Sequence, residues 1–211
     1  MKILLACEYS NTVSKEFRKK GHTVISCDLL SNDEDNTNHY QGDVFDIIDD
    51  GFDMMIAHPP CTYLTLAANK YYDINKYGEK AIQRIKDREQ AIEFFLRLWN
   101  APIEKICIEN PVGVMCNYID RENYQIIQPY HFGDAERKTT QLWLKNLTPL
   151  QYGQNLFYQS DIVKPEIIQY SSGRTSSKWH HDTFRLPSKD RWKIRSKTFP
   201  GIARAMAEQW G

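Results

Sequence analysis

Four short apolar runs set the fold that this chain of 211 residues can adopt. They cover residues 2–7, 22–28, 52–57 and 105–109. Short, continuous apolar runs are typical of strands that are buried on both faces. A helical period of apolar residues separates the third run from the fourth: Ile82, Ile85, Ile92, Phe95 and Trp99. This alternation predicts an α/β fold, with a mostly parallel sheet covered by helices on both faces.

The remaining segments complete this prediction. We expect a helix from about residue 12 to 20, a loop over 31–41, a short strand and turn over 42–48, and a loop over a site at 62–78. A late strand is predicted at 140–144 and a terminal helix at 200–210, whereas 150–197 shows turn signals and little periodicity. The expected organisation is a catalytic domain at 1–150, a small substrate-contacting segment at 151–197, and a terminal helix at 198–211 that packs back on the domain.

Polar or reactive residues follow all four apolar runs. They lie at 7–10, at Asp28, at 58–61 and at 109–111. The carboxyl ends of parallel strands meet at one edge of a sheet, and ligands of such sheets bind there. We therefore expect these groups to share one site.

Cys61 and Glu109 are the candidate catalytic residues. Cys61 follows Pro59-Pro60, which end the strand and fix the direction of the thiol, and a thiolate is a strong nucleophile. Glu109 closes a buried run, where a carboxyl group is costly unless it is used or has a partner. A thiolate that attacks C6 of a pyrimidine needs a proton donor near N3, and Glu109 with a pKa raised by burial would supply it. The alternative for Cys61 is a buried structural cysteine. The alternative for Glu109 is a helix cap or a surface salt bridge.

Further residues suit a nucleotide or a nucleic acid. Asp28 ends the second run, where an acid often binds ribose hydroxyls, and Asp43 would serve an adenine edge; the alternative is that both are solvated loop acids. Residues 171–197 hold eight Lys or Arg against two acids, together with Trp179 and Trp192. Phosphates attract such charge and bases stack on tryptophan, although an ordinary solvated surface has the same composition.

Composition bounds the remaining classes. The net charge is +0, so attraction of the whole molecule to nucleic acid is weak. The five cysteines include no C-x-x-C motif and no zinc-ligand spacing, which predicts no metal site and a reducing compartment. We see no signal peptide, and no apolar run approaches the ~20 residues of a membrane span. A cytoplasmic location is the default expectation. The sequence does not set the oligomeric state.

Pro59-Pro60-Cys61 and Glu109-Asn110-Pro111 together resemble the motifs of DNA (cytosine-5) methyltransferases that use S-adenosylmethionine. The first matches the Pro-Cys nucleophile motif, and the second is similar to the Glu-Asn-Val motif whose acid contacts cytosine N3. Residues 131–133 followed by Arg137 resemble a later motif near the target base. The resemblance covers about residues 1–145 and the last dozen.

The resemblance implies a Rossmann-like class I methyltransferase fold and a role for each matching residue. Catalysis would fall to Cys61, Glu109 and Arg137. The cofactor, S-adenosyl-L-methionine, would contact Glu8, Tyr9, Ser10, Asp28, Asp43 and Pro60. The DNA substrate would contact Asn110, Arg174, Lys178 and Trp179.

Two departures from the family keep alternatives open. The cofactor loop of the family is rich in glycine, whereas residues 7–11 here contain none. Only about 50 residues separate Trp143 from Thr198, where the family has a large target-recognition region. The alternatives are modification of a free pyrimidine nucleotide or of RNA, and a nucleic-acid-binding protein on a methyltransferase-like scaffold without catalysis. Methylation of an amino group is disfavoured, because His58 and Cys61 replace the residues that flank Pro-Pro in those enzymes.

Overall fold

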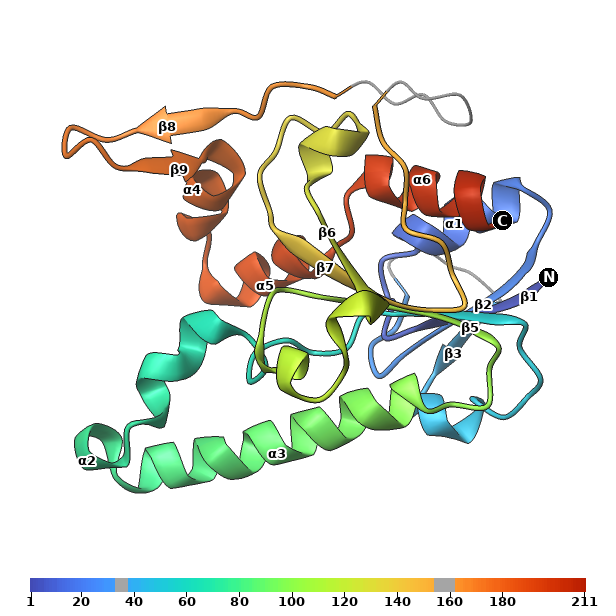
Figure 1. Cartoon of the computed structure of the whole chain (residues 1–211), viewed down its shortest axis with the longest axis horizontal. Helices are drawn as coiled ribbons and strands as arrows, with labels where there is room; N and C mark the ends of the chain where they lie inside the picture. Colours follow the sequence, from blue (N-terminus) through green and yellow to red (C-terminus); the bar gives the residue numbers. More distant parts are fainter. Residues whose placement is uncertain (33–37, 154–161) are drawn as a thin grey trace.

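A mostly parallel sheet forms the centre of the molecule, a computed structural model that describes residues 1–32, 38–153 and 162–211 (Figure 1). Within these residues the sheet has seven strands in the order β3-β2-β1-β4-β5-β7-β6. The strands are β1 (Lys2–Ala6), β2 (Thr23–Asp28), β3 (His39–Gln41), β4 (Met54–Ala57), β5 (Lys105–Asn110), β6 (Tyr124–Ile127) and β7 (Thr140–Lys145). Only β7 runs antiparallel to its neighbours in this sheet. The predicted fold class is confirmed.

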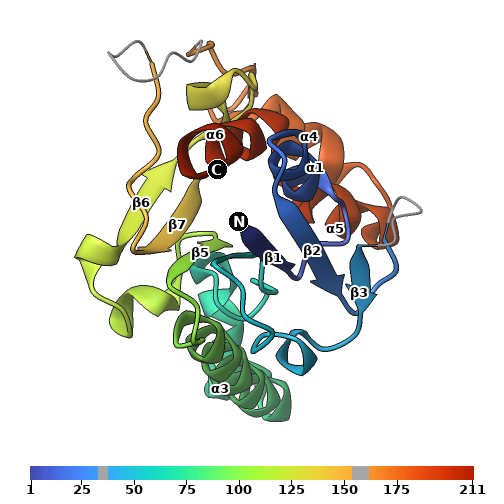
Figure 2. The same cartoon turned by 90° about the vertical axis from the view of Figure 1, so that its right-hand side faces the viewer.

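Helices cover both faces of the sheet, as Figure 2 shows. Helices α1 (Thr12–Lys19) and α6 (Pro200–Trp210) lie on one face, and the long α3 (Glu79–Trp99) lies on the other. Successive residues of a strand point to opposite faces. Ile3 and Leu5 therefore pack on the α1 and α6 side, while Leu4 and Ala6 pack on the α3 side. Burial on both faces explains why the strands appear as continuous apolar runs.

Other elements differ from the prediction. The expected loop over 31–41 ends in β3, and its residues 33–37 lie outside the described part. The expected strand over 42–48 is instead a 3₁₀ turn, η1 (Val44–Asp46). The predicted irregular segment holds β8 (Ile167–Gln169), β9 (Thr175–Ser177), α4 (Lys178–Phe184) and α5 (Ser188–Ser196). These elements are short and polar, so their sequence carries no clear period. No helix in the described ranges has the length and apolar character to cross a membrane.

The loops that follow β4 and β5 are joined to each other. Thr65 and Gly113 form an isolated antiparallel bridge, and the Val114 amide donates to the Leu64 carbonyl at 2.9 Å. The first loop then continues through η2 (Leu66–Tyr72) and α2 (Ile74–Tyr77). The second continues through η3 (Val114–Asn117), η4 (Arg121–Asn123) and, after β6, η5 (Pro129–Phe132). This bridge holds the loop that carries Cys61 beside the loop that follows Glu109 and the end of β5.

Gly113→Ala should therefore destabilise the protein. A β-carbon at this position would clash with the Leu64 carbonyl oxygen, which belongs to the backbone and cannot move aside as a flexible side chain would. We expect a loss of about 1–3 kcal/mol in the free energy of unfolding, measured by urea denaturation. Asn117→Ala, an exposed change in the same loop, should cost less than about 0.5 kcal/mol. Equal stability of the two variants would contradict the importance of the bridge.

Candidate active site

The chain order places the site at the carboxyl ends of β1, β4 and β5. The chain runs from β1 outward to β2 and β3, then returns to β4 on the other side of β1. Connections leave opposite faces at such a switch point, so a crevice opens between them. The polar groups that follow the predicted strands are therefore brought to this edge.

Cys61 lies in a turn that begins where β4 ends. The His58 amide still donates to the Ala6 carbonyl of β1 at 2.9 Å, but neither of the next two residues has an amide proton to continue the ladder. Pro59 is buried and Pro60 is exposed. The Cys61 carbonyl then accepts from the Leu64 amide at 3.0 Å. The side chain that carries the thiol is exposed.

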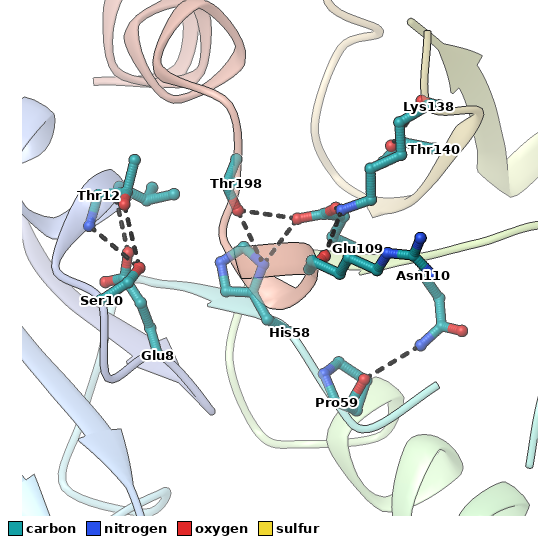
Figure 3. Close-up of polar contacts among 12 residues, drawn as sticks. Glu8, Ser10, Thr12, His58, Pro59, Glu109, Asn110, Lys138, Thr140 and Thr198 are labelled. Carbon is teal, nitrogen blue, oxygen red and sulfur yellow. Dashed lines mark hydrogen bonds and ion pairs between the residues drawn. The ribbon is translucent and has the colours of Figure 1, made fainter. Parts of the chain in front are cut away.

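The carboxylate of Glu109 has three side-chain partners in the site (Figure 3). Its Oε2 lies 2.9 Å from His58 Nδ1 and accepts from the Thr198 hydroxyl at 2.9 Å. Its Oε1 lies 3.7 Å from Lys138 Nζ. The side chain is 10% exposed. Three elements far apart in sequence thus supply partners to one buried acid.

The pKa of Glu109 moves opposite to our prediction. Burial raises it, as expected, but the Lys138 ammonium and the hydrogen bonds from His58 and Thr198 lower it further, to about 2. The expectation of a pKa raised by burial was wrong, because a sequence does not show which cations and donors will surround a buried acid. Glu109 is therefore an ionised hydrogen-bond acceptor at neutral pH.

The charges around Glu109 also act on Cys61. The residue is exposed as a whole, yet the protein atoms around its sulfur exclude enough water to raise the pKa of the thiol. The Lys138 ammonium opposes this rise, and the Glu109 carboxylate adds to it. Thiol, carboxylate and ammonium group therefore belong to one electrostatic environment.

Lys138 is a site residue that the sequence reasoning missed. Arg137, the predicted residue, is exposed, whereas the next side chain extends to Glu109. Lys138 also donates to the Arg195 carbonyl at 3.1 Å and lies 5.9 Å from the centres of the Trp179 and Phe199 rings. The adjacent basic residues at 137 and 138 were a signal, but their sequence does not show which one faces inward.

The predicted substrate residues lie in different surroundings. Asn110 is buried; its amide nitrogen donates to the Pro59 carbonyl at 3.3 Å, and its Oδ1 has no hydrogen-bond partner in the described part of the chain. Trp179 borders the site through Lys138. Lys178 forms an exposed ion pair with Glu166 at 2.6 Å. Arg174 is exposed and lies next to β9.

The predicted cofactor residues in the loop after β1, Glu8, Tyr9 and Ser10, form hydrogen bonds to other parts of the protein. Both carboxylate oxygens of Glu8 accept from the first turn of α1, at Val13 and Ser14, and thereby cap that helix. The Tyr9 hydroxyl donates to the Lys193 carbonyl of α5 at 2.8 Å. Ser10 and Thr12 contact each other through their hydroxyl groups at 3.0 Å.

Asp28 and Asp43 lie beside this loop. Asp28 ends β2 and accepts from the Leu30 amide at 2.9 Å, and burial raises its pKa. Asp43 accepts from the Phe45 amide at 3.0 Å and begins η1. Cys7, in the turn after β1, has a φ of 58°, in the left-handed region that usually favours glycine. The tight turn is thus formed without glycine.

Residues 193–198, which we call the closing strip, touch both halves of the site. Lys193 accepts from Tyr9 on the side of the first loop. On the side of the thiol, the Arg195 carbonyl accepts from the Lys138 ammonium, and the Thr198 hydroxyl donates to the Glu109 carboxylate. Six consecutive residues therefore connect the loop after β1 to the catalytic candidates.

The strand order, the antiparallel β7 and the position of the site define a Rossmann-like fold of the methyltransferase class. No family model and no curated protein matches the chain. Among solved structures, it is similar to the Entamoeba histolytica methyltransferase EhMeth, with 14% identity, a TM-score of 0.43, and coverage of 79% of this chain and 58% of that one. It is also similar to an E. coli "putative DNA modification methyltransferase" encoded within a prophage, with 15% identity, a TM-score of 0.43, and coverage of 79% and 52%. The chain spans little more than half the length of each.

The raised pKa of Cys61 predicts slow alkylation at neutral pH. Only the thiolate reacts, so the rate of modification by iodoacetamide should rise steeply above about pH 9, and each unit of pKa shift changes it by about tenfold. Lys138→Met removes the opposing charge and should slow alkylation further, whereas Lys138→Arg should not. Peptide mass spectrometry gives the rate at each cysteine, with exposed Cys116 as the internal reference. Faster alkylation in Lys138→Met would contradict the assigned charge effect.

The contacts of Glu109 predict how stability depends on pH. Its folded-state pKa, about 2, is below the ordinary 4.5, so its contribution is complete above pH 4.5 and is lost as pH falls toward 2. The pKa of His58 is raised above 6.5 in spite of burial, through Glu109 and Glu8, so its contribution is complete below pH 6.5 and is lost at higher pH. Glu109→Gln should therefore cost most between these values, about 3 kcal/mol.

Denaturation by urea at a series of pH values measures this cost. Glu104→Gln is the matched control, because it makes the same change at an exposed position just before β5. The control should differ little from wild type at any pH. A cost of Glu109→Gln that does not vary from about pH 2 to 8 would contradict the assigned contacts.

Proposed function

We propose that this chain transfers a methyl group from S-adenosylmethionine to C5 of cytosine in DNA. The observation that carries the proposal is the common environment of Cys61 and Glu109 at the carboxyl edge of a methyltransferase-class sheet. A nucleophilic thiol and a hydrogen-bonding group for the pyrimidine edge are the two protein groups that this reaction requires. Lys138 adds a positive charge where negative charge would develop.

The residues around the loop after β1 fit the nucleoside end of S-adenosylmethionine. The left-handed turn at Cys7 supplies the backbone conformation that glycine provides elsewhere. Asp28 presents a partly buried carboxylate for ribose hydroxyls, and the neighbouring Leu29 is 74% exposed, as suits a contact with a flat apolar ring. Asp43 lies on the same side and acts electrostatically on Cys7. When bound, the cofactor supplies the electrophilic methyl group.

The chain's own residues account for activation of the base. The Cys61 thiol first loses its proton to water. The thiolate then forms a bond to C6, and the C5–C6 π electrons shift toward C4 so that negative charge develops on N3 and O2. The Lys138 ammonium stabilises this charge, and the Glu109 carboxylate accepts from the exocyclic amino group. Once C5 carries the methyl group, a water molecule takes the C5 proton, the C5–C6 double bond returns, and the bond between C6 and sulfur breaks. Cys61 is then restored.

The surface beside the site favours a nucleic acid over a free nucleotide. The basic segment continues from β9 through α5, and Phe184 and Trp192 in it are 62% and 44% exposed. Exposed aromatic rings among cations bind single-stranded bases by stacking and phosphates by charge. A target base within a duplex would have to leave the stack to reach Cys61.

Transfer of label from tritiated S-adenosylmethionine tests the proposal. Wild-type protein should label cytosine in DNA, and Cys61→Ser should reduce transfer by at least about 10³-fold while cofactor binding, measured by calorimetry, stays nearly unchanged. Cys116→Ser, at another exposed cysteine, is the matched control and should keep full activity. Parallel assays with dCMP, single-stranded DNA, duplex DNA and RNA identify the substrate.

A base with fluorine at C5 tests the covalent step directly. Fluorine cannot leave as a cation, so the adduct cannot collapse, and protein and oligonucleotide should stay joined at Cys61. Wild-type transfer rates in Cys61→Ser would remove the mechanism. DNA affinity without any heat from the cofactor would favour a binding protein without catalysis.

A further inference from the structure

His58 stands between the two halves of the site and has no part in the reaction as proposed so far. Figure 3 shows its ring between Glu8 on one side and Glu109 with Thr198 on the other. Its side chain is only 9% exposed. Nδ1 contacts Glu109, while Nε2 is buried and has no hydrogen-bond partner among the described residues. A polar ring in such a place, with one nitrogen unsatisfied, calls for a functional explanation.

The contacts of Glu109 divide its two oxygens into different roles. Oε2 has two neighbours at hydrogen-bond distance, His58 Nδ1 and Thr198 Oγ1, each at 2.9 Å. Oε1 faces the Lys138 ammonium at 3.7 Å, which is longer than a hydrogen bond. Oε2 is therefore satisfied by the protein, and Oε1 keeps the capacity to accept from a ligand. His58 also restrains the orientation of the carboxylate, because its own amide is anchored to the Ala6 carbonyl at 2.9 Å.

We propose that His58 is a positioning residue that sets specificity: by donating from Nδ1 to Oε2, it holds Glu109 as an acceptor whose Oε1 selects the exocyclic amino group of cytosine. This inference rests on the function proposed above. Cytosine presents N4–H₂, a donor, where uracil and thymine present O4, an acceptor. A fixed carboxylate attracts the first and repels the second, whereas a protonated carboxyl group would accept either base by rotating its proton.

The charges that face His58 come from every element around it. Glu109 at the end of β5 and Glu8 after β1 favour the imidazolium form, and Lys138 before β7 opposes it. Asp28 at the end of β2 is close enough for His58 to act on it. The carboxylates prevail, so the ring is held as a donor toward Glu109. The position of His58 directly before Pro59 disfavours the helical region for its backbone and restricts it to extended conformations.

The first experiment tests the contact without any activity. Nitrogen-15 NMR of the imidazole ring should show Nδ1 protonated in the wild type, with a titration midpoint above 6.5; the signal is assigned by its absence in His58→Phe. The midpoint should fall in Glu109→Gln. His22→Gln, at a histidine distant from the site, should leave it unchanged. An unchanged midpoint in Glu109→Gln overturns the inference whether or not the protein transfers methyl groups.

The second experiment measures specificity. Oligonucleotides that carry one cytosine or one uracil at the same position are compared as methyl acceptors by kcat/KM. Wild type should prefer cytosine by at least about 100-fold, because the uracil O4 meets a carboxylate. His58→Phe keeps an aromatic ring but cannot donate, and should lose at least about tenfold of that preference. Thr198→Val, which removes the other donor to Oε2, should lose about threefold and serves if His58→Phe does not fold. His22→Gln should keep both the rate and the preference.

The outcomes separate the two claims. Transfer to cytosine with the same preference in His58→Phe and Thr198→Val overturns the role of His58 and leaves the proposed function standing. No transfer by wild type to any acceptor overturns the proposed function and this inference with it, while the NMR titration still decides whether the contact exists. Lower rates with an intact preference assign His58 a purely structural role and also overturn the inference.

Discussion

The buried, ionised carboxylate of Glu109 is the interaction on which the site depends. An unpartnered charge at 10% exposure would be strongly unfavourable, so its presence requires the cation and donors around it. These partners are His58 after β4, Lys138 before β7, and Thr198 in the closing strip before α6. A single acid at the end of β5 thereby fixes the relative positions of segments that are up to 140 residues apart, at His58 and Thr198.

The same arrangement explains the protonation state of the Cys61 thiol. Cys61 lies near one cation and one carboxylate, so its thiol is not activated by a strong local positive potential. Under the proposed function, a ligand that engages Glu109 would weaken the repulsion between its carboxylate and the thiolate, and would thereby favour reaction. A thiol kept in its protonated form until the substrate arrives is also protected from unwanted oxidation or alkylation.

The sheet and the main helices could be predicted because their signals are local. Short apolar runs such as Met54–Ala57 favour buried strands, and the period of apolar residues over Glu79–Trp99 favours a helix. Cys61 and Glu109 could be placed at one edge because parallel strands end together. Lys138 could not be found, since its orientation depends on an irregular segment before β7. The protonation state of Glu109 followed from Lys138 and Thr198, and no local pattern contains those contacts. β3 and α5 were missed because short polar elements take their form from tertiary neighbours.

The closing strip, residues 193–198, has a mechanical consequence for ligand exchange. Its carbonyl and hydroxyl groups hold Tyr9 on one side, and Lys138 and Glu109 on the other. A displacement of the closing strip that releases Tyr9 also removes the carbonyl that accepts from Lys138 and the hydroxyl that donates to Glu109. Binding of a molecule beside the loop after β1 is thus thermodynamically linked to the contact between Lys138 and Glu109. This linkage acts equally in both directions.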